Sequence, residues 1–170
     1  MRSGVALGSN LGDRLQHLRS AFRSLSVLHE GPHEELRTSS IFETIPVGCE
    51  PGTGSYLNAV VEVRTSLPPL RFLERLRAIE MQLGRPLKRP RNAPRTIDLD
   101  VLYYNNLVLC HDDLVIPHPR LAQRRFVLAP LAEIAPDLVL AGHSRPVSAL
   151  LGDLVDDEDV RLLQDCLDEH

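Results

Sequence analysis

The sequence of 170 residues contains no tryptophan, and aromatic residues make up only 4% of it. Proteins that bind single-stranded nucleic acid stack bases on aromatic side chains, and a net charge of −4 provides no general attraction for a phosphate backbone. Both features argue against a metal-dependent nucleic-acid enzyme, so we expect no nucleic-acid partner.

Long hydrophobic runs are also missing from the sequence. No run approaches the roughly 20 apolar residues that span a bilayer, and the N-terminal residues open directly into a short apolar segment without a signal-peptide pattern. We therefore expect a cytoplasmic protein with no membrane partner.

Cysteine is scarce, and the three that occur, Cys49, Cys110 and Cys166, are widely spaced. An odd number of distant cysteines argues against a disulfide framework and has no zinc-binding spacing. At 170 residues the chain can bury about two-thirds of the surface that its unfolded form exposes, without such cross-links. We expect a single domain over residues 1–170.

Charge is distributed unevenly along the chain. The segment of about residues 150–170 holds eight acids and one arginine, Arg161, and its leucines Leu162, Leu163 and Leu167 have helical spacing, which predicts a loosely docked terminal helix. By contrast, residues 85–95 contain no acid and five basic residues, Arg85, Lys88, Arg89, Arg91 and Arg95. A basic loop next to acidic residues indicates a small polyanionic ligand.

The acidic residues in question lie on the segment from Arg95 to Tyr104, which alternates with period two. As a strand it places Asp98 and Asp100 on one face, roughly 7 Å apart. The other face takes Ile97, Leu99, Val101 and Tyr103. Three interpretations are open for the two carboxylates: a solvated face, an arginine clamp through Arg95, or divalent metal that carries a phosphate.

The order of the predicted elements indicates the fold. Strands at residues 3–7, 35–45, 56–63 and 95–104 are interrupted by a helix from Leu15 to Leu25 and a second helix that Pro68-Pro69 opens. The second helix has an apolar stripe that comprises Leu70, Leu73, Leu76, Ile79 and Leu83. By its position near the end of this helix, Glu80 is expected to be exposed to solvent. The order predicts an α+β fold with a ferredoxin-like βαββαβ core, an antiparallel sheet with helices packed on it, and C-terminal additions.

Six short motifs occur in register along most of the chain: Leu7-Gly8-Ser9-Asn10-Leu11-Gly12, Phe42-Glu43-Thr44-Ile45-Pro46-Val47-Gly48, Tyr56-Leu57-Asn58-Ala59, Gly84-Arg85, Pro94-Arg95-Thr96-Ile97-Asp98-Leu99-Asp100 and Pro117-His118-Pro119-Arg120. Together they resemble the 6-hydroxymethyl-7,8-dihydropterin pyrophosphokinase family of folate biosynthesis. The resemblance implies an ATP-dependent diphosphotransferase that makes the pterin diphosphate and AMP. It also implies ATP and the pterin as partners of a monomer, and two Mg²⁺ ions held by Asp98 and Asp100.

The resemblance further implies roles for individual residues. The catalytic set matches Arg85, Arg95, Asp98 and Asp100, and the nucleotide set matches Glu80, Arg85, Lys88, Arg95, Val101, His118 and Arg124. Tyr56 and Phe126 match the two rings that sandwich the pterin, whose polar edge would be read by Thr44, Ile45, Val47 and Asn58. A flat, polar-edged ring needs such stacking faces and in-plane hydrogen bonds.

The sequence departs from the family pattern in the basic loop. Asn92-Ala93 stands where many members have a tryptophan, and Leu87 stands where a second arginine is common. Lys88 or Arg89 can replace that arginine in part, and the Lys88 ammonium would attract phosphate without the bidentate fork of a guanidinium. An alternative reading is a non-catalytic ferredoxin-like module that binds a small molecule.

Overall fold

The computed structural model describes residues 1–45, 54–84, 95–155, 159–164 and 167. In chain order its elements are β1 (Arg2–Ser9), α1 (Arg14–Ser26), β2 (Arg37–Thr38), β3 (Ile41–Ile45), β4 (Tyr56–Arg64), α2 (Pro69–Gln82), β5 (Asp98–Tyr104), β6 (Leu109–His111), β7 (Leu114–Ile116), α3 (Arg125–Ile134), α4 (Val147–Asp153) and β8 (Asp159–Gln164). Short 3₁₀ turns lie at His33–Glu35 and Leu121–Gln123.

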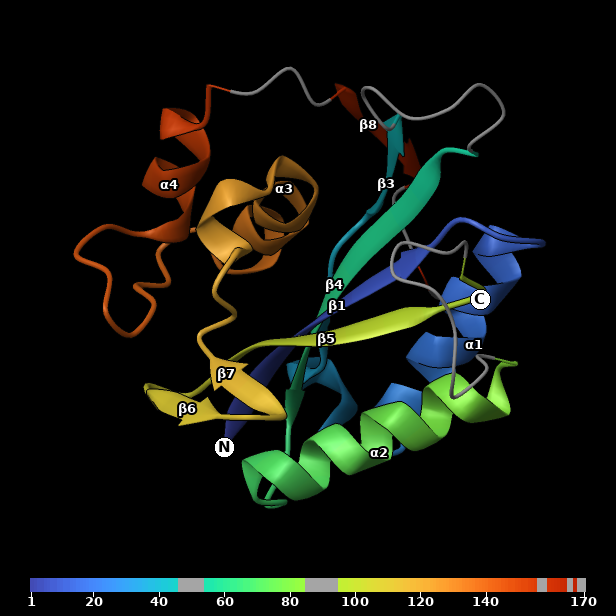
Figure 1. Ribbon diagram of the computed structural model, residues 1–170, viewed down its shortest axis with the longest axis horizontal. Coiled ribbons are helices and arrows are strands. Elements are labelled where there is room, and N and C mark those ends of the chain that lie inside the picture. The colour runs from blue at the N-terminus through green and yellow to red at the C-terminus, as the bar shows by residue number, and fades with distance from the viewer. Residues whose placement is uncertain (46–53, 85–94, 156–158, 165–166, 168–170) are drawn as a thin grey trace.

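The main sheet has the strand order β5-β1-β4-β3-β8, with β2 also paired to β4, and the pairs are antiparallel (Figure 1). Its inner part, β5-β1-β4-β3, is the order of a βαββαβ unit, in which each helix returns the chain across one face of the sheet. The predicted ferredoxin-like core is therefore confirmed. The strand expected over residues 35–45 is divided into β2 and β3, which both pair with β4.

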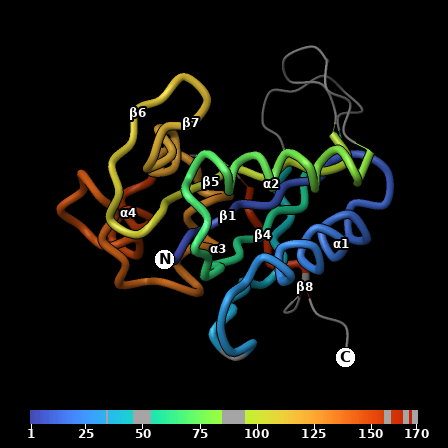
Figure 2. The backbone as a smooth tube through the Cα atoms, turned by 90° about the horizontal axis from the view of Figure 1, so that it is seen from below, coloured from blue at the N-terminus to red at the C-terminus, as the bar shows by residue number. Residues whose placement is uncertain are grey.

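Helices cover both faces of this sheet (Figure 1), and the view in Figure 2 shows the same separation of α1 and α2 from α3 and α4. Alternate residues of β4 enter the two resulting cores, as the alternating pattern predicts. Leu57 and Val61 belong to the core under α1 and α2, whereas Val60 packs with Leu128 and Leu131 of α3. The strand therefore carries one set of side chains toward each layer, and Asn58 shares the α3 face with Val60.

A β-bulge changes the expected faces of β5. Gly4 lies opposite Tyr103 but Val5 lies opposite Val101, so Leu102 is an extra residue in β5. Leu102 and Tyr103 consequently both join the core under α3. The prediction that Tyr103 shares a face with Val101 is wrong, because alternation within one strand carries no information about a bulge. A Cβ on Gly4 would come within 2.2 Å of the Tyr103 ring, so glycine is required there.

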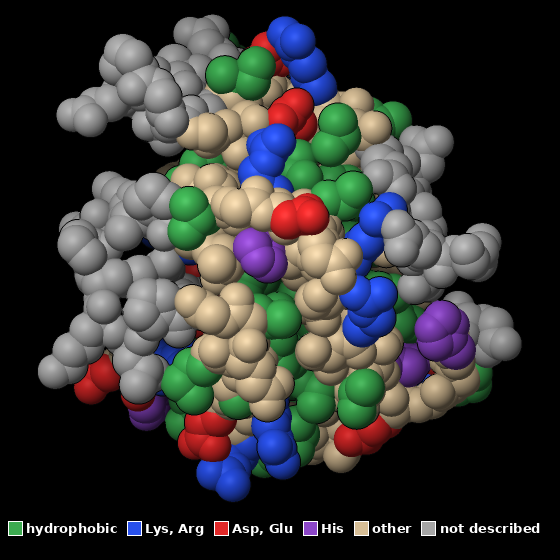
Figure 3. Space-filling model, turned by 90° about the vertical axis from the view of Figure 1, so that its right-hand side faces the viewer, with side chains coloured by type: hydrophobic (Ala, Val, Ile, Leu, Met, Phe, Trp, Pro, Cys, Tyr) green, Lys and Arg blue, Asp and Glu red, His purple; other side chains and the backbone are tan. Residues whose placement is uncertain are grey.

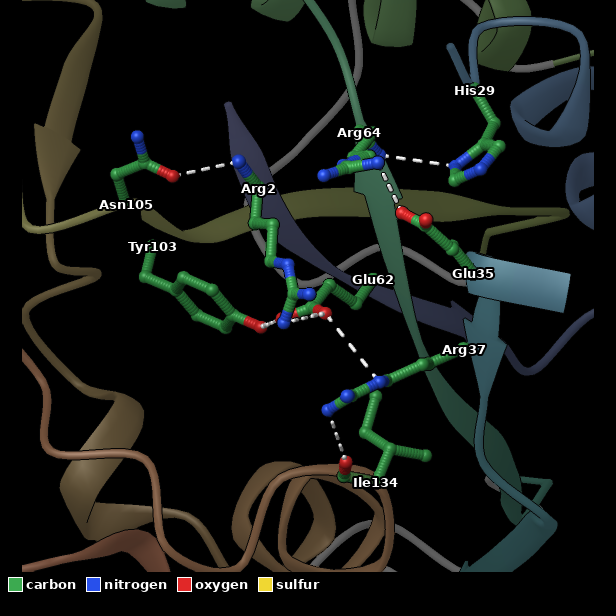
Figure 4. A network of polar contacts seen from close by, with 9 residues as sticks. All are labelled: Arg2, His29, Glu35, Arg37, Glu62, Arg64, Tyr103, Asn105 and Ile134. Carbon is green, nitrogen blue, oxygen red and sulfur yellow. Dashed lines mark hydrogen bonds and ion pairs between the residues drawn. The ribbon is translucent and has the colours of Figure 1, made fainter. Parts of the chain in front are cut away.

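The Tyr103 hydroxyl points toward a buried acid of β4, Glu62 (Figure 4). It donates a hydrogen bond of 2.5 Å to Glu62, which is only 5% exposed. Arg2 and Arg37 approach the same carboxylate at 3.6 and 3.9 Å. Arg37 also donates to the carbonyl of Ile134 at 3.3 Å, so this network ties the C-terminal end of α3 to the sheet.

The second helix is rotated relative to the predicted stripe. Leu76 and Ile79 are buried as expected, but Leu70 is 36% exposed and Phe72 is fully buried in its place. The expectation for Glu80 is also wrong, since this residue faces the sheet and is buried. Pro69 begins the helix, and the buried positions then follow from Phe72 at intervals of three and four residues.

The C-terminal segment forms a strand where the leucine spacing predicted a helix. Residues Asp159–Gln164 form β8, which pairs with β3. The spacing of the leucines could not reveal this outcome, because the strand depends on hydrogen bonds to another part of the chain. The outer edge of β3 offers N–H and C=O groups with which this segment pairs.

None of the described helices is long and apolar enough to cross a membrane. On the side of the molecule shown in Figure 3, hydrophobic side chains lie interspersed with acidic and basic ones. Such scattered apolar exposure is normal for a protein surface.

Candidate active site

Two cavities meet at the acidic end of β5. The first, of about 250 Å³, lies among the ends of β1, β3, β4 and β5 and the start of α3. The second, of about 340 Å³, lies between α2, β5 and the segment that contains β7 and His118. Asp98 and Asp100 line both cavities. The two carboxylates are therefore the shared wall between two ligand-sized spaces, a relation that no single strand pattern could reveal.

The first cavity gathers the described residues that we expected around a pterin. Its lining includes Thr44, Ile45, Tyr56, Asn58 and Phe126. Asn58 donates a hydrogen bond of 2.8 Å from Nδ2 to the Thr44 hydroxyl, and both residues are 6% exposed. The cavity thus combines two aromatic rings with a buried, oriented amide. One further expected residue, at position 47, lies outside the described residues.

The residues expected around a nucleotide divide between the cavities. Glu80, Val101 and His118 line the second cavity. Arg95 and Arg124 line the first, and the Arg124 guanidinium lies 5.4 Å from the centre of the Phe126 ring. Arg85 and Lys88, together with Leu87 and Asn92, lie outside the described residues.

Arg95 forms an ion pair with Asp98 and donates a hydrogen bond to it. The arginine-clamp interpretation therefore describes Asp98 in this structure. The backbone of Arg95 is held in turn by Asn10, whose Oδ1 accepts from the Arg95 N–H at 2.8 Å and whose own N–H donates to the Arg95 carbonyl at 3.2 Å. Asn10 was missed by the sequence interpretation, although a Gly-Ser-Asn run directly after a central strand is a signal for such a role.

Burial and mutual repulsion act on the second carboxylate. The pKa of Asp100 is raised, first by burial and then by the negative charge of Asp98, while His118, Arg124 and Arg95 oppose the shift. The pKa of His118 is lowered by burial, against the attraction of Asp100. The acidic end of β5 would therefore be stabilised by additional positive charge.

Glu80 fixes the backbone between the two aspartates. The N–H of Leu99 donates a hydrogen bond of 2.8 Å to Glu80 Oε1. The carboxylate is 7% exposed, so it binds this donor in a largely dry setting. Glu80 therefore acts on Asp98 and Asp100 through the strand that carries them.

No group of three or more His, Cys, Asp or Glu side chains in the described part of the chain is arranged to hold a metal ion by itself.

The fold and the paired cavities define a class: an α+β protein with a ferredoxin-like core and a ligand site at one end of its sheet. Among solved structures, the chain is similar to wild-type HPPK-DHPS of Plasmodium falciparum crystallised with pteroate, with a TM-score of 0.69 and 16% identity. The similarity covers 89% of this chain and 42% of that one, so this chain spans about two fifths of its length. At this identity the likeness establishes the fold.

Sequence comparison establishes the family. Residues 4–136 match the model of the 7,8-dihydro-6-hydroxymethylpterin-pyrophosphokinase (HPPK) family, and the chain belongs to that family. It is 47% identical over 131 residues to 2-amino-4-hydroxy-6-hydroxymethyldihydropteridine pyrophosphokinase of Bacillus subtilis, covering 76% of this chain and 75% of the relative. The enzyme of the same name from Haemophilus influenzae is 37% identical over 158 residues, which are 93% of this chain and 96% of the relative.

Proposed function

We propose that the protein transfers the pyrophosphoryl group of ATP to the hydroxymethyl group of 6-hydroxymethyl-7,8-dihydropterin, in folate biosynthesis. The products are the pterin diphosphate and AMP. Family membership supports this activity, and one structural observation carries it: Asp98 and Asp100 line both cavities, so an acceptor and a donor can meet at the same carboxylates. Holding two reactants in line supplies much of the catalysis that phosphoryl transfer requires.

The first cavity is assigned to the pterin. Tyr56 and Phe126 supply aromatic faces for a flat ring, and the amide of Asn58 supplies a donor and an acceptor in one plane. The hydrogen bond from Asn58 to Thr44 orients that amide before the ligand arrives. A preorganised polar group loses little entropy on binding, which favours a specific heterocycle over other apolar ligands.

The second cavity is assigned to the nucleotide, with Glu80, Val101 and His118 among its lining residues. Arg95 and Arg124 face the shared end from the pterin side, where the transferred phosphates would pass. Arg95 forms an ion pair with Asp98, and its planar guanidinium can also bind a phosphate oxygen of the nucleotide. Arg85 and Lys88, which lie outside the described residues, are assigned to the same nucleotide on the family resemblance.

Magnesium fits the carboxylate pair. Mg²⁺ is bound in phosphoryl-transfer sites by one or two carboxylates together with substrate phosphates, and Asp98 and Asp100 provide two such groups. Burial, and then the negative charge of Asp98, raise the pKa of Asp100, so a cation would stabilise its charged form. When bound, the ions would neutralise phosphate charge and polarise the transferring group. Asp98 and Asp100 would hold them, and Glu80 would keep the strand between the two aspartates in place. We assign no general base.

The decisive experiment measures AMP release from ATP by the full chain, with and without the pterin and with Mg²⁺ present or chelated. AMP that forms only when pterin and metal are both present supports the proposal. Pterin binding without AMP release, in the presence of both ATP and Mg²⁺, would instead support the non-catalytic binding module. An Asp98→Asn variant serves as the control, because asparagine has nearly the same size and shape as aspartate and lacks the charge that would bind the metal.

A further inference from the structure

Strand β3 supplies Thr44 and Ile45 to the first cavity, and its outer edge is covered by β8 (Figure 1). Thr44 lies opposite Tyr56 of β4 on one side and Val160 of β8 on the other. Ile45 has a partner only on the β8 side among the described strands, where it lies opposite Asp159. The last residue of β3 that lines the cavity is thus aligned by β8.

The residue before Thr44 links this edge to the rest of the site. Glu43 Oε1 accepts hydrogen bonds from Arg14 at 3.0 Å and from the Ser55 hydroxyl at 2.5 Å. Ser55 directly precedes Tyr56, one of the two aromatic residues of the cavity. Arg161 of β8 lies opposite Glu43, and its positive charge adds to the lowering of the pKa of Glu43. A shift of β3 would therefore also disturb the start of β4.

The attachment of β8 depends on its backbone and on one later residue. Its central leucines are largely exposed, Leu162 at 57% and Leu163 at 49%. Leu167, by contrast, is 1% exposed and lies in the core beneath α1 and α2. The C-terminal segment is therefore fastened at two places, by the ladder to β3 and by the burial of Leu167.

We propose that β8 is a positioning element for the acceptor side of the active site: its ladder to β3 holds Thr44 and Ile45 in the conformation that binds the pterin. This inference rests on the proposed function and extends it to a segment beyond the family match, which ends at residue 136. A strand end with one free edge frays more readily than a paired one, and a ligand would then have to order it at a cost in affinity. The nucleotide cavity contains no residue of β3 and would not bear that cost.

The test uses the full chain with Val160→Pro and Arg161→Pro combined. Successive N–H groups of a strand point to opposite sides, so one of the two prolines must remove an N–H that faces β3. We expect the Kd for 6-hydroxymethyl-7,8-dihydropterin to rise about tenfold or more, and the Kd for a non-hydrolysable ATP analogue without pterin to change by less than about twofold. The conservative variant, Val160→Thr with Arg161→Lys, keeps both N–H groups and the charge, and should restore pterin binding.

Each outcome is informative. If the wild-type chain binds no pterin, the proposed function fails; if it binds pterin and the folded proline variant binds it equally well, only this inference fails. An equal loss of pterin and nucleotide affinity would also overturn the inference, since it would indicate a general structural role. Should the proline variant not fold, Leu167→Ala releases the second attachment. Loss of hydrogen-exchange protection in residues 159–164 with unchanged pterin affinity in that variant would then overturn it.

Discussion

Replacing Asn58 by alanine tests the assignment of the first cavity most directly. The side chain is 6% exposed and donates a 2.8 Å hydrogen bond to Thr44 Oγ1. Its removal would leave polar atoms on the bound pterin without partners in a buried setting, which costs about 1 to 3 kcal/mol. This range corresponds to an increase in the pterin Kd of about 5-fold to about 140-fold.

The effect must be separated from a simple loss of structure. Thr44→Val removes the acceptor of the same internal hydrogen bond while it leaves the amide of Asn58 in place. Both variants should lose about 1 kcal/mol of unfolding free energy, as measured by urea denaturation, because each loses that bond. Only Asn58→Ala should show the full loss of pterin affinity.

Equilibrium titration of the pterin, with the urea midpoint of each variant as a control, decides the matter. An unchanged pterin Kd in a folded Asn58→Ala protein would refute the assignment. Equal pterin affinities in the two variants would refute a role specific to the amide, because they would trace the effect to Thr44 or to the hydrogen bond that it shares with Asn58.

Three further perturbations follow from the same geometry. Asp98→Ala or Asp100→Ala should lower the rate of AMP formation by on the order of a thousandfold, because the lost carboxylate would bind the metal that neutralises the phosphates. The Kd for the pterin should stay near the wild-type value. A turnover rate within a factor of ten of wild type would contradict this prediction. Glu80→Gln replaces a charged acceptor for the Leu99 N–H by a neutral one. It should lower kcat about tenfold, with a smaller change in the KM for the pterin. An unchanged kcat would contradict this prediction. Glu43 should stabilise the fold in a pH-dependent way, because hydrogen bonds from a serine hydroxyl and an arginine lower its pKa below the usual 4.5; its contribution is present above that value and is lost as pH falls through the lowered pKa. The urea midpoints of the wild type and Glu43→Gln should therefore converge in acid, and a constant gap would count against the assignment.

Local patterns were sufficient for several features of this protein. The alternation of residues 95–104 predicted that Asp98 and Asp100 share a face, and the order of strands and helices predicted the ferredoxin-like core. Both follow from interactions within an element or between neighbours in sequence. The six motifs, read in register, led to the family that the comparisons confirm.

Other features depended on contacts between distant segments. The bulge opposite Gly4 turned Tyr103 to the second face of the sheet, and the rotation of α2 buried Glu80 against the N–H of Leu99. Neither feature could be predicted from the local sequence. The periodicity of apolar residues indicates which residues share a face of an element, but not which other element that face contacts.

The aspartate pair and the C-terminal strand likewise each show one feature that local sequence indicated and one that required the folded chain. The period-two spacing predicted that Asp98 and Asp100 share one face of a strand, whereas the two cavities that they separate exist only in the folded chain. Likewise the acidic C-terminal segment has helical leucine spacing, yet it adopts a strand because the open edge of β3 satisfies its backbone hydrogen bonds. Periodicity thus determined most of the elements and the six motifs pointed to the family, whereas tertiary contacts decided which edges, faces and cavities those elements share.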